Sequence, residues 1–159
     1  MTWLAADEAS SAELARRLAA SPALAHALLY LHGEIGAGKT TLVRHLLRAL
    51  GVSGRIKSPS YAIAETYSAP PGAHWSAGLE IVHFDFYRFN DPREWEDAGL
   101  RELFAQAGLK LVEWPSQAAP LLPMPDLELH LQTLPDAQRQ IRLRACSPTG
   151  ARLLAAVQP

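Results

Sequence analysis

The sequence predicts an α/β fold, in which helices alternate with the strands of a mixed sheet. One observation is the segment 33–40, which reads G-E-I-G-A-G-K-T and matches the pattern G-x-x-x-x-G-K-T. The other is its setting: an apolar run of strand length, 27–32, precedes it, and residues 41–50 carry apolar side chains at helical spacing. Gly51 stands where that helix should end. This strand–loop–helix order is what a phosphate-binding P-loop requires.

The residue types in this loop suit a nucleotide phosphate. Glycines allow successive backbone N–H groups to turn toward one anion, and the following helix directs its N-terminus to the same point. Lys39 reaches the terminal phosphates, and the Thr40 hydroxyl is a ligand for Mg²⁺. A chance Lys-Thr pair beside a glycine-rich turn is the competing interpretation, and the flanking strand and helix argue against it.

The composition describes one globular unit without a strong electrostatic bias. Of the 159 residues, 48% are hydrophobic and 19% are charged, and the net charge is −1. We therefore expect one domain over residues 1–159, with no global field that attracts nucleic acid or membrane. One cysteine, Cys146, excludes an internal disulfide and fits a reducing cytosol. The first residues do not resemble a signal peptide, and no apolar run reaches membrane-spanning length.

Two segments flank the P-loop unit. Residues 10–13 read Ser-Ser-Ala-Glu, a capping box that predicts a helix beginning at Ser10 and ending before Pro22. This helix is a candidate neighbour of the nucleotide base. After the loop helix, segment 52–61 places basic and hydroxyl side chains around Pro59. Such loops often sense phosphate through a hydroxyl group, and an ordinary solvated connector is the equal alternative.

Two later strands end in a carboxylate. Residues 61–67 alternate as a strand, and after a turn-rich connector residues 79–85 return as its hairpin partner and end at Asp85. Residues 109–113 form an apolar strand that ends at Glu113, the general form of a Walker B element. Ligands gather at the carboxyl edge of open α/β sheets, and a P-loop needs an acid nearby. Spacing does not choose between the two acids.

The rest of the chain supplies supporting elements. Asp91 is the expected cap of a short helix that ends at Gly99, and residues 100–107 form a second. Residues 127–132 and 140–145 alternate as an antiparallel pair, and a short helix closes the chain. From the pattern alone, the arginines at 139, 142 and 144 either decorate the solvent face or contact a nucleotide. The six histidines are scattered without the pair spacing of metal ligands, so we expect no metal site from them.

Four segments in this order resemble one family, the TsaE (YjeE) ATPases of bacterial tRNA threonylcarbamoyladenosine biosynthesis. A P-loop alone indicates only a nucleotide, whereas the ordered set is highly specific. The chain departs from the family pattern at Ser60, where Thr is common and the hydroxyl is kept, and at Ser116, where Glu or Gln is common. The four segments are residues 33–42, 57–61, 83–88 and 112–115.

The resemblance implies a P-loop NTPase three-layer sandwich, with a mixed, mostly parallel sheet and antiparallel strands, that binds ATP and Mg²⁺. It implies a weak, partner-stimulated ATPase in the cytoplasm, away from membranes. The partners are the TsaD and TsaB subunits, which transfer a threonylcarbamoyl group to adenosine 37 of tRNAs that read ANN codons. In that family ATP turnover resets the TsaD–TsaB complex, and tRNA is reached only through the complex.

The resemblance also assigns roles to single residues. Lys39, Asp85 and Ser60 support hydrolysis, whereas Thr40 and Glu113 hold Mg²⁺. The residues implied in nucleotide binding are Glu8, Gly36, Ala37, Gly38, Lys39, Thr40, Thr41 and Arg139, with Glu8 and Arg139 on the adenine side.

Other functions remain as alternatives. A small-molecule kinase with a P-loop needs an Arg-bearing lid, and segment 116–125, where a lid would lie, has no arginine. A GTPase-like switch usually needs an Asn-Lys-x-Asp element, which segment 90–93 does not match. A module that holds ATP without hydrolysing it is distinguished only by a turnover measurement. Because the sequence places no arginine clearly at the γ-phosphate, we expect slow hydrolysis by the chain alone.

Overall fold

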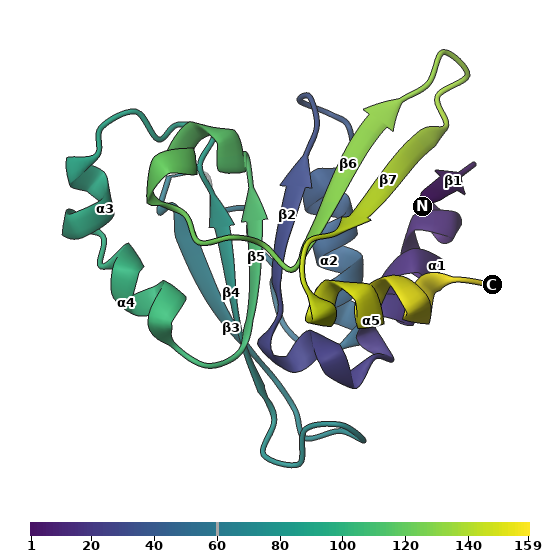
Figure 1. Ribbon diagram of the computed structural model, residues 1–159, viewed down its shortest axis with the longest axis horizontal. Helices are drawn as coiled ribbons and strands as arrows, with labels where there is room; N and C mark the ends of the chain where they lie inside the picture. The colour runs from purple at the N-terminus through teal and green to yellow at the C-terminus, as the bar shows by residue number, and fades with distance from the viewer. Residues whose placement is uncertain (60) are drawn as a thin grey trace.

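The computed structural model describes residues 1–59 and 61–159, and within them seven strands form one sheet (Figure 1). The strand order is β1-β7-β6-β2-β5-β4-β3. The four central strands, β6, β2, β5 and β4, run parallel, and β1, β7 and β3 pair antiparallel at the two sides. The predicted mixed α/β sheet is therefore confirmed. The strands are β1 (Thr2–Ala5), β2 (Leu28–His32), β3 (Ala64–Ala69), β4 (Leu79–Asp85), β5 (Leu109–Glu113), β6 (Leu127–Thr133) and β7 (Arg139–Ala145).

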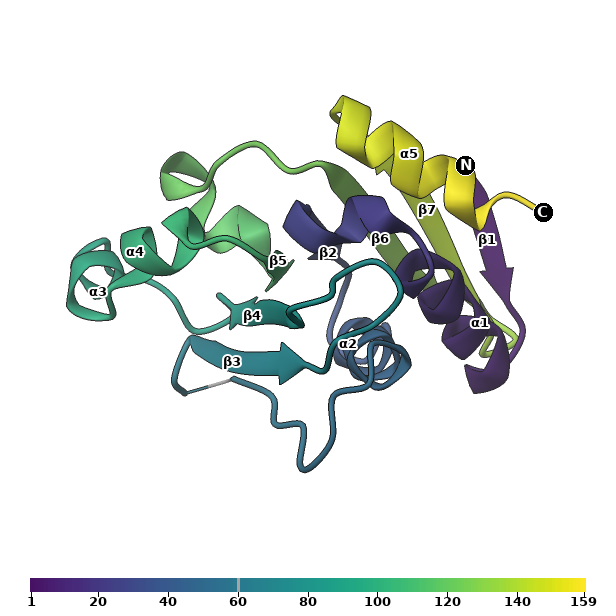
Figure 2. The same ribbon diagram turned by 90° about the horizontal axis from the view of Figure 1, so that it is seen from below.

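Helices cover both faces of this sheet and complete a three-layer arrangement (Figure 2). On one face lie α1, α2 and α5, and on the other lie α3, α4 and the 3₁₀ segment η2. None of the described helices is long and apolar enough to cross a membrane. The helical elements are α1 (Glu8–Ala19), η1 (Pro22–His26), α2 (Lys39–Ala49), α3 (Arg93–Asp97), α4 (Leu100–Ala105), η2 (Pro115–Leu121) and α5 (Pro148–Val157).

Alternation along the strands divides the interior into two cores. In β2, Leu29 and Leu31 face the core formed with α1, α2 and α5, whereas Leu28 and Tyr30 face the core on the opposite side. The second core is aromatic, and the Phe84 ring stacks on other rings there. Burial of such a side chain contributes roughly 1.5–3 kcal/mol. The first core continues into β6 and β7, whereas the second core ends before them and leaves their alternate side chains partly or fully exposed.

The structure corrects several predicted boundaries. Helix α1 begins at Glu8, two residues before the predicted capping box, because the Asp7 carboxylate caps it and accepts from the Ser10 amide at 2.8 Å. An anionic cap also interacts favourably with the helix dipole. Strand β3 begins at Ala64, since Ile63 has a left-handed φ of 65° that interrupts the predicted strand. Strand β1 was not predicted, because a four-residue edge strand carries too little alternation to recognise.

Candidate nucleotide-binding site

The loop between β2 and α2 has the backbone conformation that its glycines were expected to provide. Gly36 and Gly38 have φ values of 78° and 102°, in the left-handed region. A Cβ atom on Gly33 would lie 2.5 Å from the carbonyl oxygen of Leu131, so a side chain there would collide with β6. The loop therefore turns tightly at the carboxyl end of β2, and α2 begins at Lys39 directly behind it.

Lys39 holds its ammonium group against the loop. Its Nζ donates to the carbonyl oxygens of Gly33, at 2.5 Å, and Glu34, at 2.8 Å. The same atom lies 4.3 Å from the ring centre of Trp114, a cation–π contact. Burial lowers the pKa of Lys39, while the nearby carboxylates of Glu113 and Asp85 oppose that shift. The group is positioned to pair with a phosphate seated in the loop.

Glu113 connects the loop helix to the end of the sheet. The Thr40 Oγ1 donates to its carboxylate at 2.9 and 3.0 Å, and the His83 Nε2 lies 2.9 Å from its Oε1. Glu113 and His83 are almost fully buried. A hydroxyl and a carboxylate are hard oxygen donors of the kind that Mg²⁺ prefers. This donor set fits the ion that the resemblance implies.

Sequence reasoning missed His83. Its signal is a polar residue inside an apolar strand, two positions before Asp85 and therefore on the same face of β4. The structure shows that this imidazole contacts the carboxylate of Glu113, which also accepts from Thr40, and that His83 and Glu113 are both buried. We assign His83 a positioning role.

Asp85 lies directly beside Glu113, since the two residues are paired across β4 and β5. Its Oδ1 accepts from the Tyr87 amide at 2.9 Å. Burial raises the pKa of Asp85, and the charge of Glu113 adds to that shift. Among the described contacts, Thr40 bonds to Glu113 rather than to Asp85. The structure therefore separates the two acids that sequence spacing left equivalent.

Two adjoining cavities surround these groups. One, of about 340 Å³, contains the side chains of Lys39, Asp85 and Glu113, and the other, of about 210 Å³, lies beside the start of α1. Gly38, Thr41 and Arg139 line both. All eight residues that the resemblance implies in nucleotide binding line one cavity or the other. Gly36, Gly38, Lys39, Thr40, Thr41 and Arg139 line the larger, and Glu8, Ala37, Gly38, Thr41 and Arg139 line the smaller.

The smaller cavity brings together distant parts of the chain. Arg139, at the start of β7, donates from Nη1 to the carbonyl oxygen of Ala137 at 2.5 Å. Glu8 opens α1, and its Oε1 lies 3.1 Å from the His45 Nε2 of α2. The first helix thus lies beside the loop, where the sequence made it a candidate. The predicted role of Ser60 concerns a residue outside those that the structure describes.

Comparison with known proteins decides the family. The model of the family described as "Threonylcarbamoyl adenosine biosynthesis protein TsaE" matches residues 5–141. The chain belongs to the TsaE family. This family takes part in the biosynthesis of threonylcarbamoyladenosine in tRNA, as the resemblance of the four segments predicted.

Individual TsaE relatives agree in sequence and in fold. The tRNA threonylcarbamoyladenosine biosynthesis protein TsaE of Haemophilus influenzae is 38% identical over 129 residues, which cover 81% of this chain and 77% of that protein. The TsaE protein of Bacillus subtilis is 34% identical over 118 residues, 74% of this chain and 69% of that protein. A crystal structure of Bacillus subtilis YdiB superposes with a TM-score of 0.77 at 25% identity, covering 99% of this chain and 93% of that chain.

Proposed function

We propose that this TsaE-family chain is a Mg²⁺-dependent ATPase that acts on the TsaD–TsaB complex in the cytoplasm. In this proposal, ATP turnover resets the complex between rounds of threonylcarbamoyl transfer to adenosine 37 of tRNAs that read ANN codons. The chain does not transfer the group itself, and it meets tRNA through the complex. The observation that carries the proposal is the meeting of Lys39, Thr40, Asp85 and Glu113 around one cavity at the mouth of the P-loop.

The two cavities suggest how ATP would lie. The larger one contains the loop amides and Lys39 and would take the β- and γ-phosphates. The smaller one, beside Glu8 and Arg139, would take the adenosine portion. Its lining mixes apolar side chains with these two charged groups and Asp7, as expected for a base that needs both stacking and orientation.

The residues divide the chemistry of hydrolysis among them. Thr40 and Glu113 would hold Mg²⁺, which neutralises phosphate charge when it is bound with ATP. Lys39 stabilises charge that develops on the terminal phosphate oxygens. Asp85 is positioned to orient the attacking water, and its raised pKa, caused first by burial, favours acceptance of a proton. His83 keeps the Glu113 carboxylate oriented toward Thr40.

Slow turnover by the isolated chain follows from the placement of its arginines. Of the described arginines, Arg139 alone lines the larger cavity, and it does so where that cavity meets the smaller one. A positive charge supplied by a partner at the γ-phosphate is worth about 10³–10⁵ in phosphoryl-transfer rate. TsaD–TsaB would therefore raise the rate. A small-molecule kinase is the second candidate, and segment 116–125 still offers no arginine for a lid.

The test measures ATP hydrolysis by the chain alone and with purified TsaD–TsaB, beside a Lys39→Ala variant. We expect low basal turnover, a rise with the complex and loss of both in the variant. In parallel, threonylcarbamoyl-tRNA formation by TsaD–TsaB should continue over many rounds only with the active chain. A rate of ATP hydrolysis that TsaD–TsaB does not change would refute the reset role. Phosphoryl transfer to a metabolite would favour the small-molecule kinase.

A further inference from the structure

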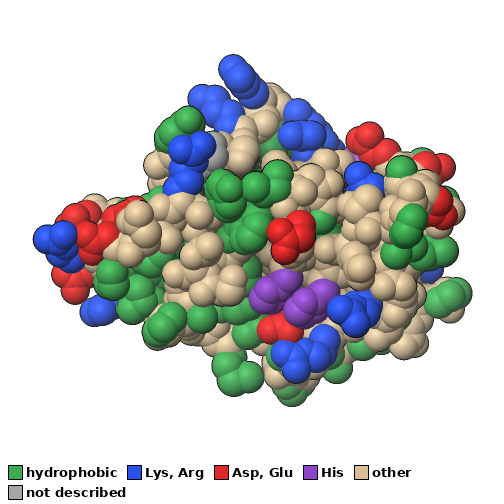
Figure 3. Space-filling model, turned by 90° about the horizontal axis from the view of Figure 1, so that it is seen from above, with side chains coloured by type: hydrophobic (Ala, Val, Ile, Leu, Met, Phe, Trp, Pro, Cys, Tyr) green, Lys and Arg blue, Asp and Glu red, His purple; other side chains and the backbone are tan. Residues whose placement is uncertain are grey.

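Three potential metal ligands lie together at the sheet, and none of them lines the two cavities of the nucleotide site. Figure 3 shows histidine side chains beside an acidic side chain on the surface. His32 is the last residue of β2, and Glu128 and His130 lie on β6. His32 and His130 are register partners across the parallel strand pair, so their side chains emerge side by side. Glu128 is two residues from His130 and therefore on the same face. The two histidines are far apart in the sequence, and the pairing of β2 with β6 brings them together.

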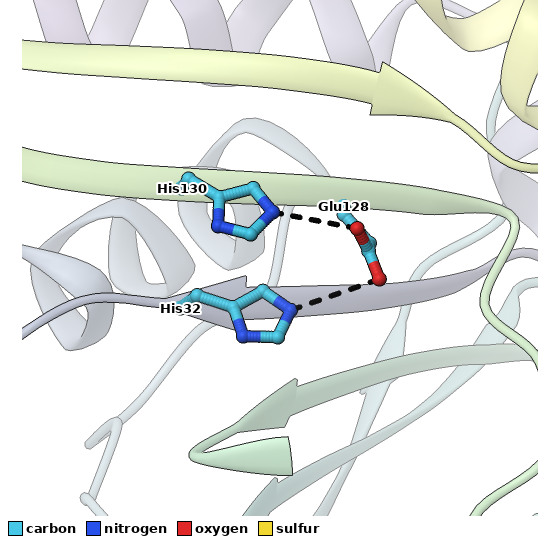
Figure 4. Close-up of side chains that lie close together, drawn as sticks. All are labelled: His32, Glu128 and His130. Atoms are coloured by element: carbon cyan, nitrogen blue, oxygen red, sulfur yellow. Dashed lines mark hydrogen bonds and ion pairs between the residues drawn. The ribbon is translucent and has the colours of Figure 1, made fainter. Parts of the chain in front are cut away.

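Both imidazoles direct the same nitrogen to one carboxylate (Figure 4). The His130 Nε2 lies 3.3 Å from Glu128 Oε2, and the His32 Nε2 lies 3.9 Å from Glu128 Oε1. The two rings are stacked, with centroids 4.4 Å apart and planes 5° from parallel. The three potential ligand atoms all lie within 4.8 Å of one another. Two nitrogens and one oxygen therefore lie close together on one patch of the sheet.

The Nε2 atom of His32 lacks a hydrogen-bond partner among the described residues. Its Nε2 is shielded from solvent and makes no hydrogen bond with any residue that the structure describes. The 3.9 Å separation from Glu128 is too long for such a bond. An enclosed polar atom without a partner costs free energy unless a water or an ion satisfies it.

Arg144 fixes the carboxylate in this arrangement. Its Nε and Nη2 donate to the Glu128 Oε2 at 3.0 and 2.6 Å, which leaves Oε1 on the side of His32. Carboxylates that bind metals are commonly held by hydrogen bonds from outside the ligand set.

We propose that His32, Glu128 and His130 bind one divalent transition-metal ion, of which Zn²⁺ is the best fit, with a water molecule as the fourth ligand. Imidazole nitrogens favour Zn²⁺ and its neighbours over Mg²⁺, and three protein ligands with an open position are typical of reactive zinc centres. Zinc–nitrogen bonds are about 2.0–2.1 Å long. The ligand atoms of a tetrahedral site with such bonds lie closer together than 4.8 Å, so the present ligand atoms must approach one another by at most about 1.5 Å. A tilt of the two stacked rings toward each other would provide this closure.

The site is distinct from the one that would hold Mg²⁺ with ATP. Glu113 shares a strand face with Leu111, in the core beneath α2, whereas His32 shares a face with Tyr30 on the opposite side of the sheet. The Mg²⁺ site offers hydroxyl and carboxylate oxygens, and the second site offers mainly nitrogen. Failure of the zinc proposal would therefore leave the ATPase proposal unaffected, and the reverse also holds.

The experiment titrates purified, nucleotide-free chain with Zn²⁺ in competition with a chromophoric chelator, in a large excess of Mg²⁺ that occupies oxygen sites. We expect one Zn²⁺ per chain. His32→Asn, His130→Asn and Glu128→Gln should each weaken binding by more than about 10-fold, because loss of even a supporting hydrogen bond weakens metal sites by that much. His74→Asn, which alters an exposed histidine elsewhere, should bind as the wild type does.

Two further readings keep the test decisive. Thermal unfolding without metal confirms that each variant folds, and zinc should raise the unfolding temperature of the wild type but not of the three site variants. Co²⁺ should give the visible absorption of a four-coordinate ion without a thiolate charge-transfer band. No bound Zn²⁺, binding that survives in the His32 and His130 variants, or a thiolate band from Cys146 would overturn the proposal.

Discussion

Lys39 and Lys110 lie at opposite ends of the parallel sheet and share most of their local properties. Both side chains are buried, and burial lowers the pKa of both. Each ammonium donates to two backbone carbonyl oxygens: Lys39 to those of residues 33 and 34, Lys110 to those of residues 106 and 108. They differ in their neighbours, because only Lys39 lies beside a threonine hydroxyl, two carboxylates and a cavity.

This difference shows which feature indicates function. A buried lysine with satisfied hydrogen bonds is compatible with a purely structural role, as Lys110 illustrates. At the carboxyl end of the sheet, parallel strands deliver Asp85 and Glu113 to the place where the P-loop begins, so complementary groups meet around an open space. At the amino end of the sheet, the described residues do not place complementary charged groups around a cavity, and the polar groups there join neighbouring elements.

The largest effect should separate the two lysines. Lys39→Ala should reduce ATP turnover by at least about 10²-fold, because it removes a preorganised charge from the terminal phosphate, while the fold is retained. Lys110→Met should leave turnover within a few-fold and instead lower the free energy of unfolding, since the Lys110 contacts join β5 to the segment before it. Steady-state turnover and chemical denaturation measure the two. Equal losses of ATP turnover in the two variants would contradict the distinction between Lys39 and Lys110.

Two arginines of β7 extend the comparison to the adenine side. Arg139 lines both cavities, whereas Arg142 points to the exposed face of the sheet. Arg139→Ala should weaken ATP binding by about 10-fold, the equivalent of one charge-assisted hydrogen bond or about 1.4 kcal/mol. Arg142→Ala should leave the affinity unchanged. Calorimetric titration of both variants with ATP measures these affinities. An Arg139→Ala variant that binds ATP as tightly as the wild type would show that this residue is not part of the site.

The smallest effect concerns stability and pH at Asp85. Its pKa is raised by burial above the ordinary value of 3.8, so the folded protein binds a proton more readily than the unfolded chain. The free energy of unfolding therefore falls as pH rises above 3.8 and the buried carboxyl loses its proton, and the destabilising effect of the buried charge is present at neutral pH. Asp85→Asn should raise the free energy of unfolding at pH 7 by up to about 1 kcal/mol, as functional-site replacements commonly do, while turnover falls.

Asp126 is the matched acid at the amino end of the sheet. Its Oδ2 accepts from the Leu28 amide at 2.8 Å and its Oδ1 from the Ser147 hydroxyl at 2.5 Å. Asp126→Asn should therefore destabilise the fold by about 1 kcal/mol, because one of these acceptors becomes a donor. Denaturation of both variants from pH 7 toward pH 4 measures the effects. The advantage of Asp85→Asn should shrink as pH falls, and a constant advantage would contradict the pKa argument.

The sequence made the carboxyl edge predictable because its motifs are contiguous. The loop 33–40 carries its own spacing, and Asp85 and Glu113 each end an apolar run, so the sheet rule places them together. The bounds of β4 and β5 were predicted as observed. The choice of Glu113 over Asp85 as the partner of Thr40 was implied only by family resemblance, and the side-chain contacts agree with it.

Other features depend on long-range pairing that no local pattern reveals. His32 and His130 are far apart in the chain and meet only because β2 and β6 are neighbours in a particular register. Arg139 reaches the P-loop only because β7 pairs with β6. Asp7 rather than Ser10 caps α1, since two adjacent residue types compete for one capping role and the local pattern fits both.

The most direct test of the account measures ATP affinity with and without Mg²⁺ in the wild type, Glu113→Gln and Glu80→Gln. Glu80 is the matched control, because its carboxylate accepts from the Ser68 hydroxyl at 2.8 and 2.9 Å, as that of Glu113 does from Thr40, but away from the P-loop. Mg²⁺ should tighten ATP binding in the wild type and in Glu80→Gln, and this effect should disappear in Glu113→Gln. A Mg²⁺ effect of full size in Glu113→Gln would contradict the proposed metal-binding role of this edge.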